Sequence, residues 1–344
     1  PGVVDLRALE GYRRLLQGCR DRGIAPVVCL HHFSEPTWFA DRGGFAARDA
    51  PMYFARHAER VVKAYGELVD WWLTINEPNV YAAGGWMLGQ FPPGRTGDFR
   101  GVARTLGGLV RAHGAAYRAV HALQPRARVG WAHHLATFEP ASSGVRDRKA
   151  AATLDAVFNG AFLDSVLDGS VPRPFRRWTG DVSGAIGTFD FLGFNTYGRM
   201  HVAFDPRRPG DLFTRRTVPE GVLAGDGDSM ESHGEPYPQG IGPFARRLAV
   251  HGVPVYVLEN GVPDEDDRIR PWVVATAART LHELIAEGVD VRGYFHWSLV
   301  DNWEWERGWE QRFGLYALDV ETGERTLRPS GELYRTLITP HPSP

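Results

Sequence analysis

Two glutamates end short apolar segments, and each has an asparagine beside it. They are Glu77, in the motif Thr-Ile-Asn-Glu-Pro, and Glu259, in the motif Leu-Glu-Asn-Gly. A pair of carboxyl groups about 5 Å apart can cleave a glycosidic bond with retention of configuration. One group, protonated, donates its proton to the departing oxygen, and the other, ionised, attacks the anomeric carbon. The two groups need only meet in space, so their separation along the chain is no obstacle.

Each glutamate also has a structural explanation when it is taken alone. Glu77 stands before Pro78 and could favour the N-terminus of a helix, where a carboxylate is stabilised by the helix dipole. Glu259 precedes an Asn-Gly pair and could be a turn residue. Nearby polar residues favour the chemical reading. The Asn76 amide could bind a sugar hydroxyl, and the Tyr197 phenol could hydrogen-bond a carboxylate and keep it ionised.

The segment from His296 to Trp309, HWSLVDNWEWERGW, holds four tryptophans interleaved with acidic residues. Indole N–H groups need partners, so this composition is poorly suited to an apolar core. A sugar presents an apolar ring face and a rim of hydroxyls, which aromatic platforms and carboxylates match. The segment therefore indicates a sugar site. The structural alternative is an aromatic cluster that closes one end of the fold.

Short apolar segments alternate with longer amphipathic ones along the chain. This pattern predicts βαβ units with parallel strands buried on both faces. The expected strands are Ile24–His32, Trp71–Glu77, Ala127–His133, Phe189–Tyr197, Val253–Glu259 and Val291–Ser298. The expected helices are Leu6–Gly18, Phe54–Val69, Leu106–Leu123, Ala151–Leu167, Phe244–His251 and Trp272–Glu287.

Every expected strand ends in polar or aromatic residues. They are His31-His32, Asn76-Glu77, His133-His134, Asn195 with Tyr197, Glu259-Asn260 and Trp297-Ser298. A (β/α) barrel places its active site at the carboxyl ends of its strands, so we predict an α/β TIM barrel. The Gly-, Pro-, Asp- and Arg-rich stretch 199–240 has no clear periodicity. We expect it to be a long loop at the rim of the site, with a flexible surface insertion as the alternative.

Other chemistries lack their motifs. No G-x-G-x-x-G or G-x-x-x-x-G-K follows a strand, which removes support for a nucleotide-binding fold, and no G-x-S-x-G elbow supports a hydrolytic triad. The two His-His pairs are adjacent residues, which point to opposite faces of a strand, and no H-E-x-x-H or C-x-x-C spacing occurs. We therefore expect no metal and no cofactor.

Composition sets further limits. The chain has 344 residues, of which 43% are hydrophobic and 23% charged, and a formal net charge of -2. Scattered basic residues and this small charge give no reason to expect a nucleic-acid partner. Two cysteines do not make a disulfide framework. No apolar run approaches the roughly 18 residues of a membrane span, and no signal peptide begins the chain, so we expect a cytoplasmic protein.

Together these motifs resemble family 1 glycoside hydrolases, which include β-glucosidases. The resemblance runs from Pro1 to about Tyr334, with the motifs in the family's order. It implies that Glu77 is the acid/base and Glu259 the nucleophile of a retaining exo-β-glycosidase. It also implies a substrate site made of His32, Asn76, Asn195, Tyr197, Trp297, Glu304, Trp305 and Phe313. Glu304 resembles members that act on unphosphorylated sugars, because its carboxylate would repel a 6-phosphate. The implied ligand is a β-glycoside or oligosaccharide.

The sequence departs from the family at two places. Leu258 stands where the family usually has threonine before the nucleophile. Family members also carry two further β/α units upstream of the position matching Pro1, and these supply a glutamine and an arginine to the sugar site. We therefore expect a single barrel domain over residues 1–344 with about six of eight β/α units. An open barrel exposes strand edges, which favours self-association or pairing with a complementing N-terminal segment.

Two alternatives to a working glycosidase follow. An incomplete barrel could be catalytically impaired, or bind carbohydrate without cleaving it, and we expect little or no hydrolase activity from the isolated chain. An unrelated barrel enzyme, such as an aldolase using a Schiff-base lysine, has weaker support. The only lysines are Lys63 and Lys149, and neither falls at the end of an expected strand.

Overall fold

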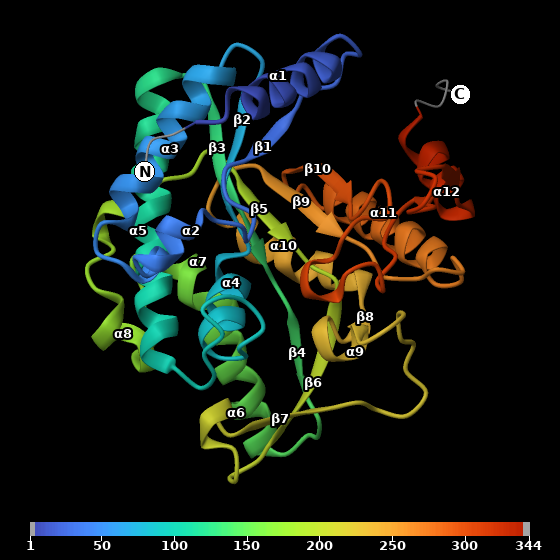
Figure 1. Ribbon diagram of the computed structural model, residues 1–344. Coiled ribbons are helices and arrows are strands. Elements are labelled where there is room, and N and C mark those ends of the chain that lie inside the picture. The colour runs from blue at the N-terminus through green and yellow to red at the C-terminus, as the bar shows by residue number, and fades with distance from the viewer. Residues whose placement is uncertain (1–3, 340–344) are drawn as a thin grey trace. The chain divides into compact units, whose positions relative to one another are not determined.

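A computed structural model describes residues 4–339 of the chain, and Figure 1 shows their helices and strands. The chain divides into two compact units, which are described separately below. The first comprises Pro1–His134 and Ala156–Leu192, and the second comprises Leu135–Asp155 and Gly193–Pro344. The single domain expected over residues 1–344 stays a prediction.

Parallel strands form the core of the first unit. Strand β1 (Val27–Cys29) pairs with β2 (Trp71–Asn76), and β2 pairs with β3 (Arg128–His134), all in parallel. Trp72 and Trp131 are fully buried. Large apolar side chains fill these strands because a parallel sheet is covered on both faces. Apart from Thr74 in β2, which is hydrogen-bonded to His113 at 2.7 Å, the polar residues of these strands lie at their ends.

The helices of the first unit are α1 (Leu6–Arg20), α2 (Thr37–Asp41), α3 (Ala50–Tyr65), α4 (Pro78–Trp86), α5 (Phe99–Leu123), α7 (Gly160–Leu167) and α8 (Arg173–Thr179). Helix α5 packs against α3 (Figure 1), and its N-cap residue is Asp98, whose carboxylate accepts the Gly101 N–H at 2.8 Å. A Cβ at Gly108 would lie 1.7 Å from the carbonyl oxygen of Phe45. Only glycine allows this close approach of the helix to the preceding loop.

The second unit carries strands β5 (Leu192–Asn195), β9 (Val255–Asn260) and β10 (Val291–His296), in that order. Helix α11 (Arg270–Ala286) of this unit packs against α10 (Ile241–Ala249) and α12 (Pro329–Ile338). Strands β11 (Tyr316–Leu318) and β12 (Arg325–Leu327) form an antiparallel hairpin before α12. Strands β9 and β10 are parallel, so the segments after them emerge at the same edge.

The prediction that residues 199–240 form a long irregular loop is wrong. It contains β6 (Gly198–Phe204), β7 (Thr214–Thr217), the short helix α9 (Ser229–Ser232) and β8 (Glu235–Pro236). Strand β6 pairs with β7, β8 and the additional strand β4 (Thr137–Pro140), forming a second small sheet. In β6 the partly buried Arg199 and His201 alternate with the buried Met200 and Val202, so this strand lacks the continuous apolar run that marks the other strands in the sequence. Whether this segment rims a site stays a prediction.

The six expected strands are confirmed, since each overlaps one strand of the structure. One expected helix, Ala151–Leu167, is instead α6 (Val145–Leu154) joined to α7 by a π-helical turn at Asp155–Asn159. By length and composition this 23-residue helical run is apolar enough to cross a membrane, but 50% of its most apolar window is buried in the fold. A buried core helix passes the same test, so the run carries no membrane assignment.

Replacing Gly108 with alanine tests the close approach of α5. The methyl group collides with the Phe45 backbone, so Gly108→Ala lowers the free energy of unfolding by about 1–3 kcal/mol. Gly184 is the control, because no atom lies within 4 Å of its added Cβ. Gly184→Ala stays within about 0.5 kcal/mol of the parent. Urea denaturation followed by tryptophan fluorescence measures both, and equal stabilities of the two variants would contradict the predicted collision.

Candidate active site

Glu77 lies at the junction of β2 and α4, in the left-handed region of the backbone map (φ 45°, ψ 60°). Few non-glycine residues adopt this conformation, and those that do are often at functional sites. The Glu77 N–H donates to the Ala132 carbonyl of β3 at 2.8 Å, which holds the residue in place. Its side chain makes no capping hydrogen bond to α4. Glu77 thus stands at the N-cap position of α4 without a hydrogen-bonded cap, and its carboxyl is directed to another partner.

His134, the last residue of β3, contacts the Glu77 carboxyl. Its Nδ1 lies 2.9 Å from Glu77 Oε1, and the two side chains are 8% and 9% exposed. The preceding residue, His133, points the other way and bonds the Asn159 carbonyl through Nε2 at 2.8 Å. The alternation of side chains along a strand thus separates the two histidines. His134 was not among the expected site residues, although its place at a strand end was the available signal.

Asn76 and His32 lie beside Glu77 in the same unit. The Asn76 amide nitrogen is 3.1 Å from His32 Nε2, and Asn76 is almost fully buried. Burial lowers the pKa of His32, and the nearby Glu77 carboxyl only partly opposes this. His32 is therefore a neutral hydrogen-bonding group at neutral pH. A neutral imidazole and an amide suit the recognition of sugar hydroxyls.

Glu259 is held at the end of β9 in the second unit. The Tyr197 phenol donates to Glu259 Oε2 at 2.5 Å, and the Thr196 N–H donates to the Glu259 carbonyl at 2.9 Å. The Asn260 amide donates to the Thr196 carbonyl at 2.7 Å and accepts from the Tyr294 phenol at 3.1 Å. A phenol hydrogen bond to a carboxylate favours its ionised form, which is the form a nucleophile needs. A role as a turn residue does not explain the hydrogen bond from Tyr197 to the Glu259 carboxylate, and Glu259 lies within β9.

The ring of Tyr197 packs between two aromatic side chains. Its centroid lies 4.9 Å from that of His233 and 5.9 Å from that of Phe313, and His233 and Phe313 are 5.7 Å apart. Phe313 was expected at the site. His233 was not, because it lies in the stretch 199–240, where no motif marks it. Asn195, two residues before Tyr197, is fully buried.

The expected sugar-binding segment follows β10. The Trp297 indole N–H donates to Glu304 Oε1 at 3.0 Å, and Trp305 adopts a left-handed backbone conformation (φ 54°). A Cβ at Gly261 would lie 2.0 Å from the Trp297 carbonyl oxygen, so the glycine after Asn260 lets this segment approach β9. Trp303 is 58% exposed and packs edge-on against Trp309. The exposed Trp303 argues against a purely structural aromatic plug.

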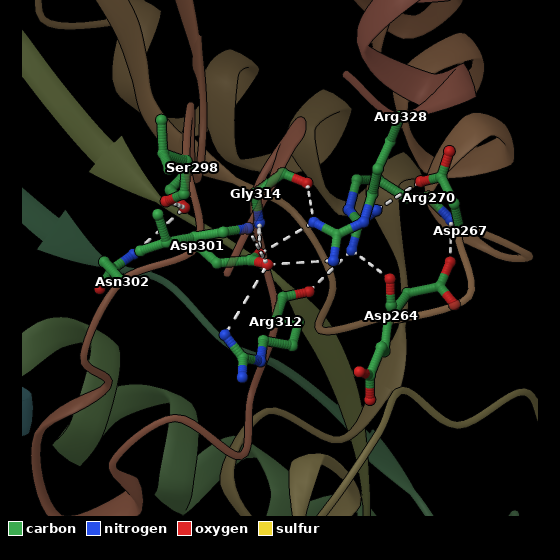
Figure 2. Close-up of polar contacts among 12 residues, drawn as sticks. Asp264, Asp267, Arg270, Ser298, Asp301, Asn302, Arg312, Gly314 and Arg328 are labelled. Carbon is green, nitrogen blue, oxygen red and sulfur yellow. Dashed lines mark hydrogen bonds and ion pairs between the residues drawn. The ribbon is translucent and has the colours of Figure 1, made fainter. Parts of the chain in front are cut away.

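A buried ion network anchors this segment, as Figure 2 shows. Asp301, whose side chain is 1% exposed, receives both terminal nitrogens of Arg328 at 2.9 and 3.0 Å. Its Oδ1 also accepts the Gly314 N–H at 2.8 Å. Ser298 N–H donates to the Phe313 carbonyl at 3.2 Å. The network thus ties the tryptophan segment to the backbone beside Phe313 and to the start of α12.

The structure groups the expected residues within each unit. His32, Asn76 and Glu77 gather in the first unit, and Asn195, Tyr197, Glu259, Trp297, Glu304, Trp305 and Phe313 belong to the second. Among residues 4–339, no group of three or more His, Cys, Asp or Glu side chains could hold a metal ion.

The fold matches those of solved glycosidases. The β-glucosidase from Thermotoga maritima in complex with glucoimidazole superimposes with a TM-score of 0.89, at 28% identity, over 98% of this chain and 79% of that chain. A β-glycosidase from Pyrococcus horikoshii gives a TM-score of 0.85 at 30% identity, over 98% and 77%. Fold and strand-end residues together define an α/β TIM-barrel protein of the glycosidase class.

Sequence comparison narrows this class to one family. The chain is 29% identical to Beta-glucosidase A of Thermotoga maritima, over 98% of this chain and 78% of the relative. It is 28% identical to a Beta-galactosidase of Pyrococcus woesei, over 98% and 73%. The model of glycosyl hydrolase family 1 matches residues 2–342. The chain belongs to glycosyl hydrolase family 1.

Removing one partner of the buried ion pair tests the anchor of the tryptophan segment. Arg328→Met leaves the Asp301 carboxylate buried without its main partner, so the free energy of unfolding falls by about 3–5 kcal/mol. Arg246→Met is the matched control, because Arg246 and Glu287 form a bidentate pair whose side chains are 47% and 48% exposed. That variant loses less than about 1 kcal/mol. Chemical denaturation compares the two, and similar losses would argue against a special contribution of the buried pair.

Proposed function

We propose that the protein is a retaining exo-β-glycosidase of the β-glucosidase type, acting through Glu77 as acid/base and Glu259 as nucleophile. The observation that carries this proposal is the 2.5 Å hydrogen bond from the Tyr197 phenol to Glu259. It suits a carboxylate that must stay ionised to attack. Glu77, by contrast, contacts an imidazole and is almost fully buried, which suits a group that exchanges a proton.

The reaction takes two steps. Glu259 attacks the anomeric carbon while the bond to the leaving oxygen breaks and Glu77 protonates that oxygen. In the second step, Glu77 removes a proton from water, the water oxygen bonds to the anomeric carbon, and the bond to Glu259 breaks. Each step inverts the configuration, so the product retains it. The mechanism requires the two carboxyl groups to work about 5–5.5 Å apart.

The proposed substrate is an unphosphorylated β-glycoside or oligosaccharide. Trp297 and Trp305 offer aromatic surfaces for the terminal sugar, and Glu304 offers a carboxylate for its hydroxyls. The 3.0 Å bond from the Trp297 indole orients Glu304. The relatives include both a β-glucosidase and a β-galactosidase, so both epimers belong in a substrate panel. No metal or other cofactor enters the proposed reaction, and a cytoplasmic location stays a prediction.

Covalent trapping tests the nucleophile. A 2-deoxy-2-fluoro-β-glucoside with a good leaving group slows the second step, so the glycosyl group accumulates on the protein. We expect mass spectrometry to find one adduct on the peptide carrying Glu259. Glu259→Ala abolishes the adduct and turnover, whereas Glu283→Gln, an exposed carboxyl on α11, changes neither. Sugar binding without any adduct in the parent would favour the non-catalytic carbohydrate-binding alternative.

A phosphorylated substrate tests the role of Glu304. The phosphate of an aryl β-glucoside 6-phosphate meets the Glu304 carboxylate, and like charges in contact cost several kcal/mol. The expected kcat/KM is therefore more than about 100-fold below that of the unphosphorylated glucoside. In Glu304→Ser, the difference in kcat/KM between the unphosphorylated and the phosphorylated glucoside becomes smaller. Glu310→Gln, which changes an exposed residue directly after the tryptophan segment, leaves that difference unchanged. A parent that prefers the phosphorylated substrate would refute the assignment.

A further inference from the structure

His134 is placed to govern the orientation of the Glu77 carboxyl. It ends β3, the strand whose Ala132 carbonyl also accepts the Glu77 N–H at 2.8 Å. One strand therefore holds the glutamate by its backbone and by its carboxyl, with His134 Nδ1 2.9 Å from Glu77 Oε1. Side-chain exposures of 8% and 9% exclude most water from the pair. A hydrogen bond in such surroundings is stronger than one in water.

The imidazole is itself fixed by its neighbours. The Asn79 amide of α4 donates to the His134 carbonyl at 2.8 Å and to the Phe158 carbonyl at 3.1 Å. The Phe158 ring packs edge-on against the imidazole, with centroids 5.7 Å apart at 81°. The ring is thus held by backbone and by packing. Its contact with Glu77 belongs to the folded framework of the first unit.

We propose that His134 is a positioning residue for the acid/base, which donates its Nδ1 hydrogen to Glu77 Oε1 and leaves Oε2 as the oxygen that exchanges the proton. This inference rests on the proposed function. A donor at Nδ1 is compatible with both forms of Glu77, provided that the acid proton sits on Oε2. An acceptor at Nδ1 would require the imidazole to change tautomer twice in every catalytic cycle.

The donor stabilises the ionised form of Glu77, which is the base of the second step. An ionised Glu77 cannot protonate the leaving oxygen, so the pH at which Glu77 ionises is the upper pH limit of the first step. Losing the donor therefore keeps Glu77 protonated to higher pH. The alkaline limb of the profile of kcat/KM against pH therefore moves to higher pH.

Other titratable groups lie on the neighbouring segments of the first unit, and of these His32 interacts with Glu77. His32 and His31 come from the segment after β1, and burial lowers the pKa of both, that of His31 to about 3. His133 of β3 points away, to the Asn159 carbonyl. The α4 side contributes Asn79, which is uncharged. His31 and His32 do not gain charge near neutral pH, so they do not account for a shift of the alkaline limb.

Two substitutions separate hydrogen bonding from packing. His134→Phe keeps an aromatic ring against Phe158 and removes the donor, and His134→Leu is a second variant without a donor. His134→Asn restores one, because asparagine Nδ2 and histidine Nδ1 are both bonded to Cγ. His121→Asn is the control, because it also removes a histidine–carboxyl contact beside β3, but at the other end of the strand. His121 contacts Asp190 at 2.9 Å, and Asp190 accepts the Val129 N–H near the start of β3.

The decisive measurement is a pH titration of the Glu77 carboxyl by carbon NMR, assigned with Glu77→Gln, which needs no turnover. We expect the midpoint to rise by about one pH unit in the phenylalanine and leucine variants, because a hydrogen bond to a charged group is lost. In the asparagine variant the midpoint lies close to that of the parent, and in the His121→Asn control it does not move. An unchanged midpoint in both donor-less variants overturns the proposal, as does an asparagine variant that behaves like phenylalanine.

Kinetics provide the second readout and separate the two hypotheses. If the parent hydrolyses an aryl β-glycoside, the alkaline limb of kcat/KM moves upward with the NMR midpoint in the donor-less variants. A purely structural role would change thermal stability and leave that limb in place, contradicting the proposal. A parent that neither hydrolyses the aryl β-glycoside nor forms the covalent adduct on Glu259 refutes the proposed function, while the carboxyl titration still decides the role of His134.

Discussion

A buried carboxylate is stable only when donors replace the water it has lost, and the site depends on this constraint. The buried Glu77 and Asp301 and the partly buried Glu259 meet it in three ways. Glu259 has the Tyr197 phenol, Asp301 has the Arg328 guanidinium, and Glu77 has the His134 imidazole. The partner suits the task in each case. A fixed anchor has a permanent cation, the proposed nucleophile has a phenol, and the proposed acid/base has an imidazole.

Parallel strands supply the geometry that lets these partners meet. Neighbouring strands running the same way end at one edge, so a residue after β2 can reach the last residue of β3. The backbone at these ends is strained, with left-handed conformations at Phe33, Glu77 and Trp305. Such conformations persist only where surrounding contacts enforce them. The hydrogen bond from Glu77 to the Ala132 carbonyl is one such contact.

The sequence predicted the six strands and the residues that follow them, because apolar runs and their polar ends are local patterns. It did not predict the small sheet built on β6, since the Arg199 and His201 face breaks the apolar pattern. Nor did it predict the roles of His233 or Asp301. His233 contacts Tyr197, which lies 36 residues earlier in the chain, and Asp301 binds Arg328, which lies 27 residues later. No motif links the members of either pair.

The sequence by itself determined which chemical groups the protein carries and at which strand ends they stand, because residue type and periodicity are local properties. The tertiary structure decided which donor each carboxyl receives, because hydrogen-bond partners come from segments that are distant along the chain. Glu77 shows the difference most clearly. The motif marked it as an acid or a helix cap. In the fold its carboxyl makes no capping hydrogen bond to α4 and contacts His134 instead.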